Sequence, residues 1–345
     1  MGVALTSPFS YIYVEDAVRD LPECRDILQR MPGSQVIRIR RMRDIFDRKR
    51  QDVRLQHRAP ALILAKKEGA RIFPGAPVCQ SFGNEHFYYT STAMNCLYDC
   101  DYCFLKGMYP SGNLVLFLNL DDVFGDVEAL LENASAYISI SYDTDLMTLE
   151  PLAHQVEKWA TFTSLHPDLS IEVRTKCDRT DLFERLLPCD RVIFAYTISP
   201  DPIIGKYEHG TPPLLATASV GSSSCGRLGA ARAAMEAGFP VRLCFDPMLR
   251  VPGWREIYRD MAAEVKSALD LSRIKDASVG TFRISRDYMK VMRRVLPDSP
   301  ITLYPYDLDD GYYHYDEGHD REMEDYLISL LAPEVPASKI FTWRK

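Results

Sequence analysis

Three cysteines lie within eight residues of one another. Cys96, Cys100 and Cys103 follow a C-x3-C-x2-C spacing, directly after a β-prone run at His86–Thr90. Thiolates are the ligands of iron–sulfur clusters, and three of them on a four-iron cluster leave one iron open, as a catalytic metal centre requires. A zinc site completed by a distant His or Cys, and three unrelated thiols, are the alternatives. The spacing favours a catalytic [4Fe-4S] cluster.

Six short β-prone runs and six helix-like patterns follow one another from position 86. The predicted strands are His86–Thr90, Ala136–Ser141, Ser170–Lys176, Arg191–Ser199, Pro240–Met248 and Ala277–Ile284. The predicted helices are Leu120–Asn133, Thr148–Leu165, Thr180–Leu187, Cys225–Gly238, Trp254–Leu269 and Arg286–Leu296. This alternation indicates a parallel sheet with right-handed crossovers. We therefore predict an α/β fold, a partial (β/α)6 TIM-like barrel whose reactive residues lie at the C-terminal ends of the strands.

Two regions flank the predicted barrel of residues 85–299. The N-terminal appendage, residues 1–84, has helix-like runs at Tyr13–Met31 and Val36–Gln56 and a strand-like run at Ala61–Ala65. The C-terminal extension, residues 300–345, is rich in Tyr and Asp and becomes helix-like at Asp320–Leu331. A chain of this length can bury a large core without disulfide bonds.

Charge is spread unevenly along the chain. The 41 Lys and Arg and 48 Asp and Glu give a net charge of −7, which is not typical of a dedicated nucleic-acid binder. Nine Lys or Arg and three Asp lie in Ile37–Arg58, whereas Tyr306–Asp325 holds nine Asp or Glu against Arg321 alone. The two segments are either solvated faces or, for the first, a basic patch for a polyanion.

The sequence predicts a cytoplasmic protein that does not enter a membrane. No run of about 18 apolar residues is present, and Met1–Asp20 lacks the basic-then-apolar pattern of a signal peptide. The nine cysteines are an odd number, so they cannot all pair within one chain. In a reducing compartment, clustered cysteines indicate metal or redox ligands.

The cysteine spacing resembles that of the radical S-adenosylmethionine superfamily, and the chain from about Pro77 to Trp254 resembles the spore photoproduct lyase family. The matching stretches are Cys96–Lys106, Asp145–Leu152, Val173–Lys176, Phe194–Ser199, Tyr207–Thr211, Gly229–Gly238 and Gly253–Trp254. The resemblance implies that Cys96, Cys100 and Cys103 hold a [4Fe-4S] cluster whose open iron binds S-adenosyl-L-methionine. It also implies repair of a UV-induced, methylene-bridged thymine dimer through a 5′-deoxyadenosyl radical.

The resemblance assigns further residues to S-adenosyl-L-methionine. Lys176 and Thr197 would hold the carboxylate of its methionine part, and Ser141 and Thr144 flank the turn that would receive its amino group. Asp145 matches an aspartate of the family in the same turn. Its alternative role is to cap the helix that follows.

Tyr102 and Tyr142 are the two predicted catalytic residues. Tyr102 matches a tyrosine of the family's proposed radical relay, whereas Phe104 replaces the second tyrosine and has no hydroxyl hydrogen to give. Tyr142 stands where the family has the cysteine that quenches the product thymine radical. A phenol can also donate a hydrogen atom, so Tyr142 is expected to take this role, with Cys177 and Cys244 as substitutes.

The implied partners are DNA that contains a thymine photoproduct and a flavodoxin- or ferredoxin-type electron donor. Tyrosines of the segment Tyr304–Tyr315 could stack on extruded bases, although their acidic neighbours would repel phosphate. Arg283 and the Arg38–Arg58 cluster are the candidate phosphate contacts. Two other functions stay open: a lyase paralogue with a different, non-DNA substrate, and a non-catalytic iron–sulfur or zinc scaffold protein.

Overall fold

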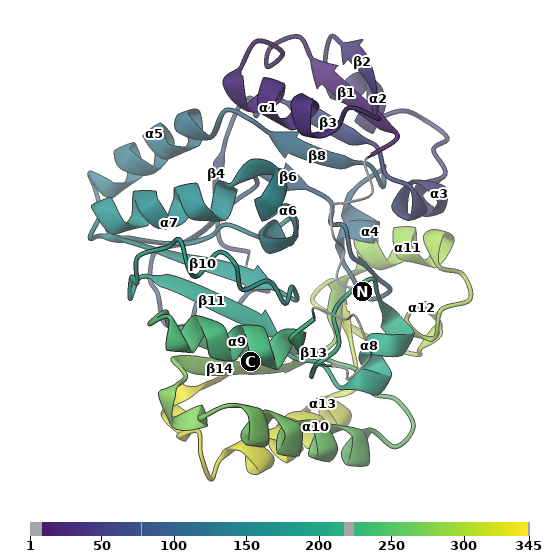
Figure 1. Cartoon of the computed structure of the whole chain (residues 1–345). Coiled ribbons are helices and arrows are strands. Elements are labelled where there is room, and N and C mark those ends of the chain that lie inside the picture. The colour runs from purple at the N-terminus through teal and green to yellow at the C-terminus, as the bar shows by residue number, and fades with distance from the viewer. Residues whose placement is uncertain (1–8, 77, 217–223, 344–345) are drawn as a thin grey trace.

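Two sheets form the frame of the protein. The structure is a computed structural model that describes residues 9–76, 78–216 and 224–343. Residues 1–8 of the predicted appendage and 344–345 of the predicted extension lie outside this part. Figure 1 shows the smaller, N-terminal sheet at the top and the larger sheet below it, with helices along the outside.

The larger sheet holds eight strands in the order β18-β14-β13-β11-β10-β9-β5-β4. Its six central strands pair with one another in parallel. They are β5 (Phe87–Thr90), β9 (Ala136–Ser139), β10 (Leu169–Thr175), β11 (Val192–Thr197), β13 (Val241–Met248) and β14 (Asp276–Thr281). Most of their residues are buried, as parallel strands covered on both faces require. Each overlaps a predicted strand, which confirms the predicted fold class.

Helices connect these strands and cover the outside of the sheet. They are α5 (Leu120–Leu131), α6 (Leu146–Ala153), α7 (Gln155–Leu165), α8 (Asp201–Tyr207), α9 (Gly226–Glu236), α10 (Trp254–Ala268) and α11 (Arg286–Val295). The predicted helix Thr148–Leu165 is two helices, because His154 takes a left-handed conformation with φ 50°. The predicted helix Thr180–Leu187 forms turns instead, since the run before Pro188 is too short for a stable helix.

The smaller sheet corrects the prediction for the N-terminal region. Its strand order is β2-β1-β3-β8-β6, formed by β1 (Tyr11–Glu15), β2 (Gln35–Ile39), β3 (Leu62–Ala65), β6 (Ala93–Met94) and β8 (Leu114–Phe117). Helices α1 (Pro22–Arg30), α2 (Arg43–Phe46) and α3 (Val53–Arg58) follow β1 and β2. The two runs predicted as helices were wrong at their starts, because Tyr, Val and Ile there pair as parallel strands.

The chain after the sixth barrel strand forms a small antiparallel sheet and then rejoins the larger one. Strands β15 (Arg283–Ser285), β16 (Asp307–Asp309) and β17 (Tyr312–His314) form the small sheet, next to α12 (Pro300–Leu303). Helix α13 (Glu317–Leu331) packs on β14, and β18 (Ile340–Thr342) pairs with β14 in parallel. At the other edge, β4 (Ile72–Pro74) pairs with β5.

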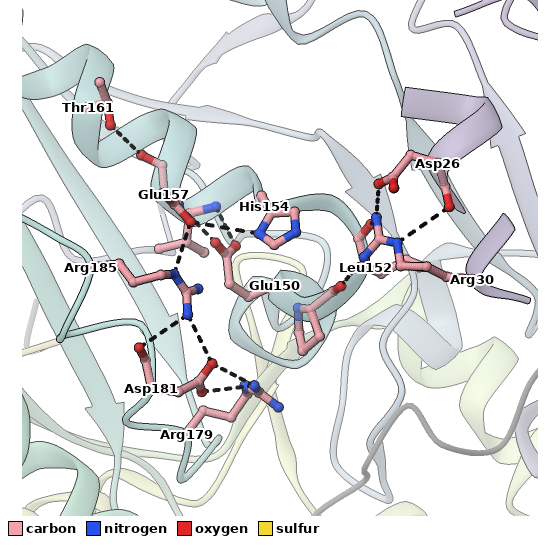
Figure 2. A network of polar contacts seen from close by, with 12 residues as sticks. Asp26, Arg30, Glu150, Leu152, His154, Glu157, Thr161, Arg179, Asp181 and Arg185 are labelled. Atoms are coloured by element: carbon pink, nitrogen blue, oxygen red, sulfur yellow. Dashed lines mark hydrogen bonds and ion pairs between the residues drawn. The ribbon is translucent and has the colours of Figure 1, made fainter. Parts of the chain in front are cut away.

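A polar network fastens the N-terminal sheet to the barrel. Figure 2 shows Arg30 of α1 reaching the end of α6, where it donates hydrogen bonds to the carbonyls of Pro151, at 2.5 Å, and Leu152, at 2.9 Å. In the same view the Glu150 carboxylate accepts from the backbone N–H groups of Val156 and Glu157, which caps the start of α7. These contacts fix the α6–α7 corner and link it to α1 of the N-terminal region.

Within the described residues, no helix combines the length and the apolar character that crossing a bilayer would require.

Candidate active site

A cavity of about 580 Å³ lies at the carboxyl ends of the parallel strands. Ser141 follows β9, Lys176 follows β10, Thr197 ends β11 and Asp246 belongs to β13, and all four line this cavity. Loops at this end of a barrel carry the reactive groups of TIM-like enzymes. The structure therefore collects residues from four different strands around one space.

The three predicted cluster ligands line the same cavity. Cys96, Cys100 and Cys103 are free thiols on a loop that begins after β6. Burial raises the pKa of Cys96 to about 12, and it also raises the pKa values of Cys100 and Cys103. Without a metal such thiols hold their protons, and a bound cluster would have to displace those protons.

No compact ligand group that includes the three thiols, as a single zinc ion would need, is found among the described residues. A structural zinc ion has four ligands, and each sulfur ligand lies about 2.3 Å from the metal. The ligand atoms of such a site are therefore close to one another. Among the described residues, the group of three whose ligand atoms all lie within 4.8 Å of one another is Glu150, His154 and Glu157, which includes none of the thiols. Its carboxylates are already occupied by backbone N–H groups and by Arg185.

A buried ion pair supports the cysteine loop from behind. Strand β7 (Asp99–Cys100) pairs with β12 (Glu208–His209), and Glu208 forms a buried ion pair with Arg227 of α9. Burial by itself raises the pKa of Glu208, but Arg227 and Lys176 outweigh it and lower the pKa to about 2. The loop that carries Cys100 is thus held by a permanently charged carboxylate.

Tyr102 takes part in this support. Its hydroxyl donates a hydrogen bond to Glu208, and the side chain is 7% exposed. The Lys176 ammonium lies 5.5 Å from the centroid of the Tyr102 ring. Tyr102 therefore lies at the cavity wall, where its ring faces Lys176, the residue that follows β10.

The residues predicted to bind S-adenosyl-L-methionine differ in whether their hydroxyls already have hydrogen-bond partners in the protein. Among the described residues, the buried Thr144 hydroxyl has no hydrogen-bond partner, and Thr144 is one of the residues that line the cavity. The Ser141 hydroxyl is already engaged: it donates to the Arg174 carbonyl at 2.9 Å and accepts from the Arg174 N–H at 2.6 Å. Thr197 is 2% exposed at the end of β11.

Asp145 positions the end of β10. It occupies the N-cap position of α6, but its side chain makes no capping hydrogen bond. Instead its carboxylate accepts from the Thr175 hydroxyl at 2.8 Å and from the Lys176 backbone N–H at 2.7 Å. The carboxylate thereby fixes the backbone from which Lys176 enters the cavity.

Tyr142 has an unexpected thiol beside it. Its ring stacks on Tyr89, with centroids 4.2 Å apart, and lies 5.5 Å from Phe104. The Cys79 thiol donates a weak hydrogen bond to the Tyr142 hydroxyl at a distance of 3.9 Å, and both residues line the cavity. A thiol and a phenol, the two usual donors of hydrogen atoms, thus meet at one point of the wall.

Sequence reasoning missed Cys79 and favoured two other thiols. Cys177 and Cys244 are buried, at 4% and 0% exposure, and neither is among the residues that line the cavity. Cys79 lies in an irregular segment before β5 that carries no periodic pattern. The only available signal was its residue type, because its position beside Tyr142 results from the fold.

The C-terminal tyrosines divide into two groups. Tyr304, Tyr306 and Tyr315 pack against one another with centroids 4.8–5.2 Å apart, and Tyr315 is 1% exposed. Tyr312 of β17 lines the cavity. Arg283 also lines it, and pairs there with Asp246 at 3.2 Å. Most of the Tyr-rich segment is therefore a packed cap, with one ring at the cavity.

Comparison with known proteins gives one consistent family. A family model described as spore photoproduct lyase matches residues 84–329. The chain is 24% identical over 271 residues to the spore photoproduct lyase of Geobacillus sp. (strain Y412MC61), covering 73% of this chain and 75% of that protein. It is 21% identical over 264 residues to that of Bacillus subtilis (strain 168), covering 72% and 73%.

Solved structures share the fold. A substituted spore photoproduct lyase superposes with a TM-score of 0.80 at 19% identity, covering 97% of this chain and 99% of that one. A spore photoproduct lyase complexed with dinucleoside spore photoproduct gives 0.78 at 18% identity, with the same coverage. A third, substituted form, which has AdoMet and the dinucleoside photoproduct bound, also gives 0.78, at 19% identity over 97% of this chain and 98% of that chain.

Proposed function

Because the chain belongs to the spore photoproduct lyase family, we propose that it is a radical S-adenosylmethionine lyase that repairs a methylene-bridged thymine dimer in DNA. The observation that carries this proposal is the cysteine triad, which opens onto a cavity at the carboxyl ends of the barrel strands. When bound, the cluster and S-adenosyl-L-methionine supply a radical that removes a hydrogen atom from the substrate.

This chain's residues hold and orient the bound groups. Cys96, Cys100 and Cys103 bind the cluster, and Lys176 pairs with the carboxylate of the methionine part. The free Thr144 hydroxyl and Thr197 add hydrogen bonds from neighbouring strands. The target dinucleotide has to leave the stacked duplex to reach a cavity that lies inside the protein.

Cys79 and Tyr142 are the proposed source of the hydrogen atom that ends the reaction. The family's donor position holds Tyr142 here, and Cys79 is within hydrogen-bond reach of its hydroxyl. We assign the donation to the Cys79 thiol, with Tyr142 orienting it. The step breaks the S–H bond of Cys79, forms a C–H bond on the product and leaves a thiyl radical. One electron from the flavodoxin- or ferredoxin-type donor and one proton would restore the thiol.

The test is anaerobic incubation of the reduced protein with S-adenosyl-L-methionine and UV-irradiated DNA of spore type. Product analysis should show restored thymine together with 5′-deoxyadenosine, and Cys100→Ala should show neither. Cys79→Ala should still cleave S-adenosyl-L-methionine but yield misquenched by-products. Cys244→Ala, which removes a buried thiol outside the cavity, should behave like the parent.

A second function is favoured by the acidic rim. Asp307 and Asp309 of β16 are exposed and pair in one small sheet with β17, whose Tyr312 lines the cavity. Carboxylates there repel phosphate, which suits a lyase paralogue with a different, non-DNA substrate. Cleavage of S-adenosyl-L-methionine without repair, together with no salt-dependent DNA binding, would select this function.

The proposed setting is the cytoplasm, with a flavodoxin- or ferredoxin-type protein as electron donor. All nine cysteines are free, which suits a reducing compartment.

A further inference from the structure

The N-terminal region carries a strongly basic surface, here called the basic face. It consists of Arg38, Arg40, Arg41, Arg43, Arg48, Lys49, Arg50, Arg54 and Arg58, all of them exposed. Arg38 pairs with Asp16 at 3.1 Å and Arg43 with Asp47 at 4.0 Å. For the other seven, no carboxylate partner is found in the described part of the chain. A chain with a net charge of −7 thus has one end with surplus positive charge.

The basic face lies directly behind the cysteine loop. Ile45 and Phe46 of α2 are buried in a hydrophobic cluster with Leu105 and Tyr109, and Cys96 and Cys103 pack against this same cluster. The Phe46 and Tyr109 rings meet edge to face, with centroids 5.5 Å apart. One layer of apolar side chains therefore separates the cluster ligands from the segment that carries the arginines.

Polar contacts fasten the same segment to the chain on both sides of the third cysteine. The Gln56 side chain accepts from the Gly112 N–H at 2.9 Å, and the Gln51 side chain donates to the Pro110 carbonyl at 3.3 Å. His57 of α3 lies 3.7 Å from Asp99, the residue before Cys100. The basic face is thus rigidly placed relative to the thiols.

The substrate cavity lies on the other side of the same loop. Its lining residues begin at Ala76, so no residue of the basic face is among them. Cys96 and Cys103 belong both to the cavity wall and to the packing behind α2. The cysteine loop therefore has two faces, and only one of them meets S-adenosyl-L-methionine and substrate.

We propose that the basic face is the docking surface for a small acidic one-electron carrier of the flavodoxin or ferredoxin type. The inference rests on the proposed radical function. In the step it serves, the reduced carrier loses one electron and the cluster gains one, and no atom is transferred. Surplus positive charge attracts a carboxylate-rich partner and orients it, while the acidic remainder of the chain repels it.

DNA is the competing polyanion, and its phosphates have better placed partners. Helix α11 contributes Asp287 and Tyr288 to the cavity wall, and Arg286, Lys290 and Arg294 of the same helix are exposed. A strand whose target dinucleotide enters the cavity passes these cations first. The basic face borders the far side of the cysteine loop, where an electron needs to enter and a base does not.

The test compares two variants that each remove two positive charges. Lys49→Gln/Arg54→Gln alters the basic face, and Arg232→Gln/Lys275→Gln alters exposed cations of the barrel. Binding of oxidised flavodoxin to the cluster-loaded protein is measured by calorimetry at low and high salt. Cleavage of S-adenosyl-L-methionine is measured with photoreduced flavodoxin and, separately, with dithionite, which needs no docking surface.

Loss of the two basic-face charges should weaken flavodoxin binding about tenfold at low salt and reduce its salt dependence. Cleavage of S-adenosyl-L-methionine driven by flavodoxin should slow when flavodoxin is limiting, whereas cleavage driven by dithionite should keep the parent rate. The barrel variant should match the parent in every assay.

Unchanged flavodoxin binding would overturn the proposal. Weaker binding of an irradiated oligonucleotide, together with slower dithionite-driven repair, would also overturn the proposal, because the basic face would then bind DNA. A parent that cannot cleave S-adenosyl-L-methionine with dithionite would instead remove the proposed function.

Discussion

At the scale of single residues, Lys176 is the cation that the fold leaves for a ligand. Its backbone N–H is fixed by Asp145 at 2.7 Å, and within the described chain its ammonium has no carboxylate within 4.0 Å. It faces the Tyr102 ring at the wall that also carries the cysteines. A carboxylate that enters this space would complete the pair.

Lys176→Ala should therefore weaken binding of S-adenosyl-L-methionine roughly tenfold to a hundredfold, since a hydrogen bond to a charged group is worth about 1.5–3 kcal/mol. Iron content should stay at the parent level, because the cysteines are untouched. Equilibrium binding to the cluster-loaded protein measures the change. Lys206→Ala, on the exposed side of α8, is the matched control, and equal affinity in both variants would exclude Lys176 from the ligand site.

The sequence indicated most of these residues because the chemistry is carried by residue type at fixed spacing. The triad and the strand-end position of Lys176 are local patterns, and both could be found without coordinates. The partnership of Cys79 with Tyr142 could not, because it joins positions 63 residues apart. The engagement of the Ser141 hydroxyl by the Arg174 backbone is likewise set by the pairing of two strands.

At the scale of elements, the short helix α4 (Leu105–Met108) sits between the third cysteine and α11. A Cβ atom added at Gly107 would lie 2.5–2.6 Å from the backbone and Cβ of Tyr288. Real atoms do not approach so closely, so the absence of a side chain at Gly107 allows α11 to pack on α4. This contact brings Tyr288 to the cavity beside Phe104, with ring centroids 6.4 Å apart.

Gly107→Ala should destabilise the protein by about 1–3 kcal/mol, the usual cost of overpacking a tight contact. Gly125→Ala is the matched control, because nothing lies within 4 Å of a Cβ added at that position of α5. This control should gain about 0.5–1 kcal/mol from helix propensity. Urea unfolding of both variants gives the comparison, and equal stabilisation by the two alanines would contradict the close packing of α4 and α11.

Elements with long-range partners were the least predictable. The six barrel strands lie in β-prone runs that alternate with helix-like patterns, whereas β1 and β2 are short and each precedes a helix. The local pattern around residues of β1 such as Tyr13 and Val14 fits a helix and a strand equally well. Pairing with β3, about 50 residues away, decides the question, and a single sequence does not display that pairing.

At the scale of the whole molecule, α3 joins the N-terminal sheet to the barrel through an acid-sensitive contact. His57 is 8% exposed in its side chain and faces both Asp99 and the buried Lys106. Burial, reinforced by the charge of Lys106, lowers the pKa of His57 to about 4, although Asp99 acts in the opposite direction. The folded protein therefore keeps this imidazole neutral at pH values where the unfolded chain would protonate it.

Stability should fall with acid in a defined window. Because the folded pKa lies below the ordinary value of 6.5, the contribution of His57 is complete above pH 6.5 and is lost as pH falls toward 4. At pH 5 the loss amounts to about 2 kcal/mol. Melting temperatures between pH 7 and pH 5 measure it. His57→Gln should flatten this slope, His86→Gln should retain it, and identical slopes in all three proteins would show that the acid response arises elsewhere.

The order of strands in the N-terminal sheet limits how far the protein can be truncated from its N-terminus. β3 comes before the cysteine loop and β8 after it, yet the two pair in parallel from Leu62 with Leu114 to Ala65 with Phe117. All four residues of β8 are buried. A version of the protein that starts after β3 would therefore keep β8 and β6 but lose the strand on the other side of β8. The unpaired apolar edge would invite aggregation, so selection for solubility ties the barrel to its N-terminal strands.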